Sequence, residues 1–182
     1  MNTRQQLASQ NREELLAAAI QVFQAHGIHA PLQLIIDQAQ VGRATFYRNF
    51  KDRKELVIAL MRQAFDRLEQ RAEQLSHFDD GFIQLIEDHV YNISYLTSLV
   101  EYWRVIVQED PSLVQMYERR DAILQPLIDR AIATGHCRAD FTTKDYAMVT
   151  SILRSSLQGA DASDQMQLAR RAVDLLLNGI RA

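Results

Sequence analysis

The chain has 182 residues with a net charge of −3, and 47% of them are hydrophobic, which is enough for a packed core and excludes wholesale disorder. One cysteine excludes a disulfide framework and a Cys-rich metal site, and it suits a reducing compartment. No leader pattern opens the sequence and no apolar run approaches a membrane span, so we expect a soluble, cytoplasmic protein with no membrane partner.

The first predicted helix runs from about Ser9 to His26. Its apolar residues recur at helical spacing and form one stripe of Leu15, Leu16, Ala19, Ile20 and Phe23. Gly27 ends this helix, because glycine readily adopts the left-handed conformation that follows many helices.

A helix-turn-helix is predicted next. Pro31 suits the first turn of a second helix, where its missing N–H costs nothing. The buried side of that helix would be Leu34, Ile35 and Ala39. Residues 39–42 are left for a turn before a third helix, which contains Thr45, Phe46 and Tyr47. Two short helices so close in sequence must cross steeply, and the first helix would cover them.

The third helix and the start of the fourth carry the most informative pattern. Five of the twelve residues from 43 to 54 are Lys or Arg, and one is acidic. Hydroxyl and amide side chains lie among them, which suits gripping phosphates and meeting base edges. Residues 1–54 hold seven Lys/Arg against four Asp/Glu (+3), and the remainder thirteen against nineteen (−6). The alternative is a solvated basic helix end whose aromatic residues only pack.

A long fourth helix is predicted from about residue 52 to residue 75. Asp52 can cap it, and Glu55 lies three residues later, which is the spacing of a reciprocal capping box. At 1.5 Å per residue, roughly 24 residues span about 36 Å, enough to connect two bodies. Residues 77–81 form the next break. We therefore divide the chain into a helix-turn-helix domain over 1–55 and a helical domain over 56–182.

The rest of the sequence also shows helical periodicity and no strand pattern. Asp110 and Pro111 would open one helix that runs to Thr134–Gly135, with a kink near Pro126. The other predicted segments are 82–96, 96–108, 144–158 and 164–180. The sequence thus predicts an all-α fold of about nine helices, in which a three-helix head is joined by a long helix to a C-terminal helical bundle.

The order of these parts, and the run from Thr45 to Phe50 with Lys51 and Leu56 around it, resembles the TetR (tetracycline-repressor-like) family of bacterial transcriptional regulators. The resemblance covers about residues 10–60. It implies that Tyr47 reaches a backbone phosphate and that Arg53 contacts phosphate through its side chain or backbone N–H. The expected DNA-binding residues are Gln33, Gly42, Arg43, Thr45, Tyr47, Arg48, Asn49, Lys51, Arg53 and Lys54.

Four residues depart from the family pattern. Gln40 stands where a turn glycine is usual, so it must tolerate positive φ or the turn must adjust. Gly42 replaces a capping Ser or Thr, although glycine is still a tolerable cap. Ile36 replaces a small residue where the two helices approach, and Pro31 replaces a hydroxyl residue, which leaves Gln33 as the polar contact there. These departures bear on individual contacts more than on the fold.

Aromatic residues crowd the predicted second domain. A ligand pocket for an apolar or aromatic small-molecule effector is one interpretation, with His89, Tyr91, Tyr95, Trp103 and Tyr117 as its candidates. Ordinary core packing is the other, and for any single residue it is favoured. His136, Cys137 and Asp140 lack metal-site spacing and indicate a loop. No catalytic motif can be placed, so neither an enzyme nor a cofactor is expected.

The last two predicted helices have wide apolar faces. Burial within one chain could explain them, but residues 172–177 are apolar over much of the helix circumference. We therefore expect a homodimer in which the last two helices of each subunit form a four-helix bundle. The expected interface residues are Ile152, Leu153, Leu157, Leu175 and Leu176. Such a dimer would place its two heads in successive major grooves, roughly 34–36 Å apart.

Two functions remain open at this point. The first is a homodimeric repressor that binds a palindromic double-stranded DNA operator and is released by a small molecule in its C-terminal domain. The second is a protein-interaction module in which the helix-turn-helix is a scaffold and the acidic C-terminal domain binds a protein partner.

Overall fold

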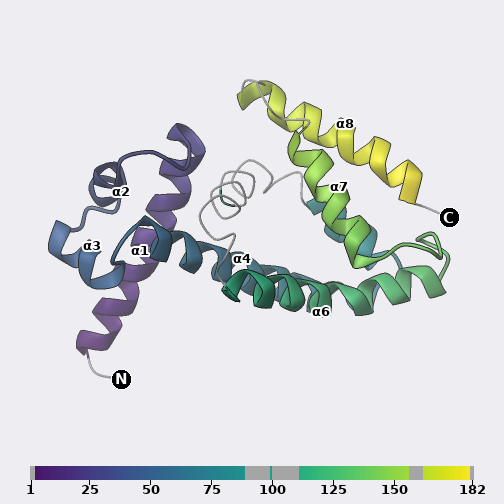
Figure 1. The fold of residues 1–182 in the computed structure, drawn as a ribbon, viewed down its shortest axis with the longest axis horizontal. Helices are drawn as coiled ribbons and strands as arrows, with labels where there is room; N and C mark the ends of the chain where they lie inside the picture. The colour runs from purple at the N-terminus through teal and green to yellow at the C-terminus, as the bar shows by residue number, and fades with distance from the viewer. Residues whose placement is uncertain (1–2, 89–98, 100–110, 156–161, 181–182) are drawn as a thin grey trace. The chain divides into compact units, whose positions relative to one another are not determined.

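The computed structural model describes residues 3–88, 99, 111–155 and 162–180 (Figure 1). Within these ranges every regular element is a helix, so the predicted all-α class is confirmed. The chain through Ala64 forms one compact unit, and the described residues from Phe65 on, Leu99 apart, form a second. The first unit therefore extends further along the fourth helix than the predicted boundary at residue 55.

The first unit contains α1 (Thr3–His26), α2 (Leu32–Gln38), α3 (Arg43–Asn49) and the start of α4 (Arg53–Leu75). Helix α1 packs against both α2 and α3 (Figure 1). It begins earlier than the sequence indicated and ends where predicted, since Gly27 follows it with a φ of 76°. The largest fully buried side chains among residues 3–64 are Leu15, Phe23, Ile35, Phe46, Phe50, Leu56 and Leu60.

Two details of α2 correct the prediction. Pro31 precedes the helix as its cap, with φ −54° and ψ 135°, and does not lie in its first turn. Leu34 is 38% exposed, whereas its neighbours Ile35 and Ile36 are buried and Ala39 is half-buried. At about 100° per residue, Leu34 lies about 150° from the centre of a face formed by Ile35 and Ile36, and it therefore points away from α1.

The start of α4 is capped nearly as predicted. The carboxylate of Asp52 accepts the backbone N–H of Glu55 at 2.9 Å. The return bond differs, because the Glu55 carboxylate accepts the N–H of Lys51 at 2.6 Å, where a reciprocal capping box would use Asp52. These two hydrogen bonds fix the start of α4 and the short connection from α3 that precedes it.

The second unit contains the rest of α4, a helical segment over residues 81–88, and the helices α6 (Pro111–Ala133), α7 (Thr143–Ser155) and α8 (Ala162–Ile180). Helix α7 packs against α6 and against α8. The hydrophobic core of the second unit includes Leu75, Phe82, Ile86, Leu124, Ile128, Ala131, Tyr146, Leu153, Ala169, Val173 and Leu177. Apart from Leu99, the predicted helix over 96–108 lies outside the described residues, as do its junction with 82–96 and the cap at Asp110.

Local sequence explains the ends of these helices. The predicted break after α4 is present, and a side chain at Gly81 would place its Cβ 2.3 Å from the carbonyl oxygen of Leu75, so only glycine fits. Helix α6 continues through Pro126, an exposed position where water can satisfy the carbonyl freed by the missing N–H. Thr142 caps α7, since its hydroxyl accepts the backbone N–H of Asp145 at 3.4 Å, and its own hydroxyl and backbone N–H donate to the Asp145 carboxylate at 2.6 and 2.8 Å.

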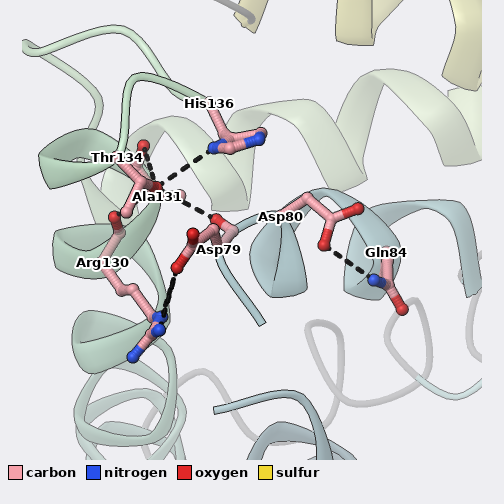
Figure 2. Close-up of polar contacts among 7 residues, drawn as sticks. All are labelled: Asp79, Asp80, Gln84, Arg130, Ala131, Thr134 and His136. Atoms are coloured by element: carbon pink, nitrogen blue, oxygen red, sulfur yellow. Dashed lines mark hydrogen bonds and ion pairs between the residues drawn. The ribbon is translucent and has the colours of Figure 1, made fainter. Parts of the chain in front are cut away.

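A polar cluster fixes the end of α6 (Figure 2). The Arg130 guanidinium pairs with the Asp79 carboxylate at 2.8 Å, and the Thr134 hydroxyl bonds to the carbonyl of Asp79 at 3.3 Å. The Nδ1 of His136 lies 3.1 Å from the same hydroxyl. These contacts attach the α6 terminus to the turn that follows α4.

Candidate nucleic-acid interface

The turn between α2 and α3 is built around a non-glycine residue with positive φ. Gln40 has a φ of 53°, and its N–H donates to the carbonyl of Asp37 at 3.1 Å. The N–H of Val41 donates to the carbonyl of Ile36 at 3.2 Å. This pair of bonds is a Schellman motif, which usually contains glycine at its left-handed position. Gln40 therefore tolerates positive φ, as its departure from the family pattern required, and the turn itself is ordinary.

Gly42 precedes α3 as its N-cap residue and provides no side-chain hydrogen bond to the helix. Its φ of −75° and ψ of 151° are accessible to any residue, and its carbonyl accepts the N–H of Thr45 at 2.9 Å. A Cβ at this position would meet nothing within 4 Å. The backbone geometry of a capped helix is thus present, and only the hydroxyl is missing.

Helix α3 is anchored by its aromatic residues. Phe46 and Phe50 are fully buried, with ring centroids 6.0 Å apart. The ring of Tyr47 meets Phe46 edge-on at 5.3 Å, while 55% of the Tyr47 side chain remains exposed. Tyr47 is therefore held at its base and presents its outer part to solvent, as a phosphate contact requires.

Three other predicted contact residues of α3 bond to one another. The Arg48 guanidinium donates to the Thr45 hydroxyl at 2.9 Å and to the carbonyl of Ala44 at 3.2 Å. The amide of Asn49 donates to the carbonyl of Thr45 at 2.9 Å. These acceptors are all uncharged, so they orient the side chains and leave the positive charge of Arg48 in place.

The first residue of α3 is tied to α2. The Nε of Arg43 donates to the amide oxygen of Gln33 at 2.7 Å, and the amide nitrogen of Gln33 donates to the Asp37 carboxylate at 2.7 Å. Asp37 and Arg43 are exposed, and Gln33 is half-buried. The structure thus brings together Gln33 and Arg43, two residues that were predicted separately as DNA contacts.

Arg53 has a different position from the one expected. Its guanidinium donates to the carbonyls of Ile28 and Ala30 at 2.5 Å each and lies 5.8 Å from the ring of Phe23. The side chain therefore holds the loop between α1 and α2 and does not extend toward solvent. The backbone N–H at the start of α4 is the group of Arg53 that suits a phosphate.

Arg12 is a residue of the site that sequence reasoning missed. From α1 its guanidinium donates to the carbonyl of Asn49 at 3.0 Å and lies 4.4 Å from the centre of the Phe50 ring. A cation suits the C-terminal end of a helix such as α3, where carbonyls lack partners. The signal was available, since Arg12 precedes the buried Leu16 by four residues and so lies on the apolar stripe of α1.

The remaining predicted cations lie where α3 passes into α4. Lys51 is exposed and Lys54 is half-buried. The backbone N–H of Lys51 already bonds to Glu55, which fixes the junction between the two helices. Contacts of these lysines with a DNA backbone stay a prediction.

The arginines of the two units differ in the partners of their guanidinium groups. In the head, the side-chain hydrogen bonds described for Arg12, Arg43, Arg48 and Arg53 all go to carbonyl, amide or hydroxyl oxygens. In the second unit the contacts go to carboxylates, and the arginines concerned are Arg71, Arg119, Arg120, Arg130, Arg138 and Arg171. An uncharged acceptor fixes a cation without neutralising it, so the head retains its positive charge for an external anion.

The ligand-pocket prediction concerns residues that are mostly outside the described ranges, namely His89, Tyr91, Tyr95 and Trp103. Tyr117 is described, on α6, where it is 38% exposed and lies 5.2 Å from the Arg120 guanidinium. The pocket itself stays a prediction.

The predicted dimer residues differ in how far they are exposed. Ile152 on α7 and Leu175 on α8 are 46% and 56% exposed, and Leu176 is partly buried. Leu153 is fully buried in the core of its own unit, because the i, i+4 spacing from Val149 places it on the inner face of α7, so it is not available to another subunit. Leu157 lies outside the described residues.

The segment around Cys137 has no sign of a metal or redox site. Cys137 is buried, and burial raises the pKa of its thiol, which keeps the thiol protonated. Asp140 pairs with Arg138, which lowers the pKa of that carboxyl. Among the described residues no group of three or more His, Cys, Asp or Glu side chains could hold a metal.

No helix among the described residues is long and apolar enough to cross a membrane.

Comparison with known proteins adds to this geometry. The model of the bacterial regulatory proteins of the tetR family matches residues 15–60. No curated protein matches the chain significantly. The solved TetR transcriptional regulator SCO0520 from Streptomyces coelicolor is 27% identical to the chain. That alignment covers 93% of this chain and 98% of SCO0520, with a TM-score of 0.71.

Two further solved structures have the same fold at lower identity. LfrR from Mycobacterium smegmatis is 20% identical, with 96% of this chain and 98% of LfrR covered and a TM-score of 0.69. SmeT from Stenotrophomonas maltophilia is 19% identical, with 94% of this chain and 90% of SmeT covered and a TM-score of 0.60.

A three-helix head with a basic recognition helix, carried by an all-α chain, defines a helix-turn-helix DNA-binding protein. With the family match over the head and the fold shared along the chain, the protein belongs to the TetR family of transcriptional regulators, which is a non-enzymatic family. Membership implies binding to operator DNA and dimerisation.

Proposed function

We propose that the protein is a homodimeric repressor that binds a palindromic operator through α3 and is released by a small-molecule effector in its second unit. The observation that carries the DNA-binding part is the set of head arginines with uncharged partners. Helix α3 presents Tyr47, Thr45 and Arg43 beside these cations, so phosphate contacts and base contacts come from one short surface.

An exposed apolar face on α7 and α8 supports the dimer. Met148 and Ile152 are 56% and 46% exposed and lie one turn apart on α7. Leu168 and Leu175 are 41% and 56% exposed and lie two turns apart on α8. A two-fold axis through this face would form a four-helix bundle from two copies, and it would bury side chains that are otherwise in water.

The effector is proposed by analogy. SmeT is described as the repressor of a multidrug efflux pump, and LfrR was solved in complex with proflavine. In the present chain α4 belongs to both units, so a ligand that favours one arrangement of the second unit could act on the head through a continuous helix. Its effect on DNA affinity would equal its differential affinity for the two states, typically about 1–3 kcal/mol.

DNA binding is tested by selecting operators from a randomised double-stranded library and measuring affinity by fluorescence anisotropy. Tyr47→Phe removes one hydroxyl from the proposed interface and should lower affinity about 10- to 150-fold, the typical effect of losing a hydrogen bond to a charged group. Tyr117→Phe removes the same hydroxyl from a tyrosine of the second unit and should leave affinity unchanged.

The competing function makes a different prediction. If the head is only a scaffold for protein interaction, no operator is selected and Tyr47→Phe changes neither DNA affinity nor transcription in cells. That result would exclude the repressor.

A further inference from the structure

The side chains of Asp37, Gln33 and Arg43 form a chain of hydrogen bonds from α2 to the recognition helix. Gln33 and Asp37 are four residues apart on α2 and thus on one face of it. The Gln33 amide nitrogen lies 2.7 Å from the Asp37 carboxylate, and its amide oxygen lies 2.7 Å from Nε of Arg43. Arg43 is the first residue of α3.

The order of donors and acceptors in this chain has a definite direction. A carboxylate can only accept, so the amide nitrogen of Gln33 must face Asp37. The amide oxygen of Gln33 must then face α3, where the Nε–H of Arg43 donates to it. Without Asp37, only the bond from Arg43 would set the orientation of the Gln33 amide.

We propose that Asp37 and Gln33 are positioning residues that hold the Arg43 guanidinium for recognition of a guanine in the operator. This inference rests on the proposed DNA-binding function. With Nε bound to Gln33, the two terminal nitrogens of Arg43 remain as a pair, which matches the O6 and N7 acceptors of guanine in the major groove. Holding the side chain in advance also reduces the rotamer freedom lost on binding.

The Gln33 amide, which lies between the Asp37 carboxylate and the Arg43 guanidinium, is uncharged, and this also favours DNA binding. A direct pair of Arg43 with Asp37 would orient the guanidinium but would offset its charge close to the phosphates. The amide of Gln33 transmits the orientation and leaves the cation to DNA.

A double-mutant cycle tests the inference on the operator selected by the wild-type protein. Affinities are measured for wild type, Gln33→Ala, Arg43→Ala and the double variant, with each guanine of the operator replaced in turn. Arg43→Ala should remove about 5- to 150-fold discrimination at one guanine. Gln33→Ala should lower discrimination at the same guanine by about 5- to 10-fold and should add nothing in the Arg43→Ala background.

Two outcomes would overturn it. If the losses from Gln33→Ala and Arg43→Ala add in full, Gln33 contacts DNA by itself and does not act through Arg43. If Arg43→Ala weakens every operator equally, Arg43 contacts only phosphate.

Asp37→Asn separates positioning from charge. Removing a carboxylate from the head should raise affinity for non-specific DNA, measured with poly(dI-dC), because one repulsion is lost. The inference predicts that discrimination at the Arg43 guanine falls at the same time. Glu13→Gln makes the same charge change on α1 and should raise non-specific affinity with no loss of discrimination. Equal behaviour of the two variants would contradict the role of Asp37.

A measurement without DNA separates failure of this inference from failure of the proposed function. In ¹H–¹⁵N spectra of the free protein, the Nε–H signal of Arg43 should be protected from solvent exchange in wild type and should lose protection in Gln33→Ala. Protection with no operator binding would refute the repressor and, with it, any reading of guanine. Operator binding with an unprotected Arg43 signal would refute the inference alone.

Discussion

The head and the second unit use arginine in opposite ways. Arg43 and Arg48 in the head donate to an amide and to a hydroxyl, whereas Arg119 and Arg130 in the second unit pair with carboxylates. The geometry is fixed in both cases. The net charge is not the same, because a carboxylate partner cancels a cation and an uncharged oxygen does not.

This difference explains how a chain of net charge −3 can bind a polyanion. The total charge is the sum over both units, and seven carboxylates of the second unit pair with arginines of that same unit. What decides DNA affinity is the charge on the surface that meets the phosphates, and there the cations are oriented without being neutralised.

The largest expected effect concerns the exposed apolar face of the second unit. The double variant Ile152→Glu, Leu175→Glu places four charges in the proposed dimer interface and should yield monomers in sedimentation experiments. Because two linked heads bind far more tightly than one, operator affinity should fall by about 100-fold or more. The double variant Phe78→Glu, Val114→Glu changes residues of similar exposure outside this face and should remain dimeric. A dimeric Ile152→Glu, Leu175→Glu variant would contradict the interface.

The next effect compares one arginine from each unit. Arg12→Ala removes a hydrogen bond to the end of α3 and a cation–π contact with Phe50, and it should lower the free energy of unfolding by about 1–3 kcal/mol. Arg171→Ala breaks an ion pair with Asp174 in which both side chains are more than half exposed, so it should cost less than about 0.5 kcal/mol. Urea unfolding measures both. Equal losses would show that partner type does not distinguish the two units.

A smaller effect is expected at the two left-handed residues of the head. Gln40→Gly removes strain at a φ of 53° and should raise the free energy of unfolding by up to about 1 kcal/mol. Gly27→Ala introduces the same strain at a φ of 76°, where no neighbouring atom obstructs the new Cβ, and should lower stability by a similar amount. Thermal unfolding would reveal the opposite signs, and two shifts of the same sign would contradict this account of the turn.

The smallest effect is expected at the start of the recognition helix. Gly42→Ser fits the extended backbone and the open space at this position and adds a side-chain cap, so stability should rise by a few tenths of a kcal/mol. Gly42→Ala offers no hydroxyl and should be no more stable than wild type. If the serine variant also binds its operator more tightly and the alanine variant does not, the added hydroxyl has reached a phosphate.

Sequence patterns were sufficient for the elements of the head. The apolar stripe of α1, the stop at Gly27 and the cap at Asp52 are local features, and each is encoded within a few residues. The positive φ of Gln40 was one of the two outcomes expected from the family resemblance, in which a turn glycine is usual at this position.

Contacts between distant residues could not be predicted in the same way. The family resemblance implied that Arg53 contacts phosphate through its side chain or backbone N–H, but its side chain bonds to carbonyls of the loop at Ile28 and Ala30. Leu153 lay in an apolar run, and only the packing of α7 shows that it faces its own core. The network of Gln33 and Arg43 joins residues ten positions apart, which becomes visible only when α2 and α3 are crossed.

The salt dependence of operator binding tests the central claim most directly. Affinity is measured between about 50 and 200 mM salt, where the slope of log K against log[salt] is about −0.9 for each phosphate neutralised. Gln33→Glu gives Arg43 a carboxylate partner, and its slope should be flatter than that of wild type by about one unit. Asp79→Asn, which removes the carboxylate partner of Arg130, should leave the slope unchanged. A wild-type affinity indifferent to salt, or a Gln33→Glu slope equal to that of wild type, would contradict the claim that uncharged partners keep the head's arginines available to DNA.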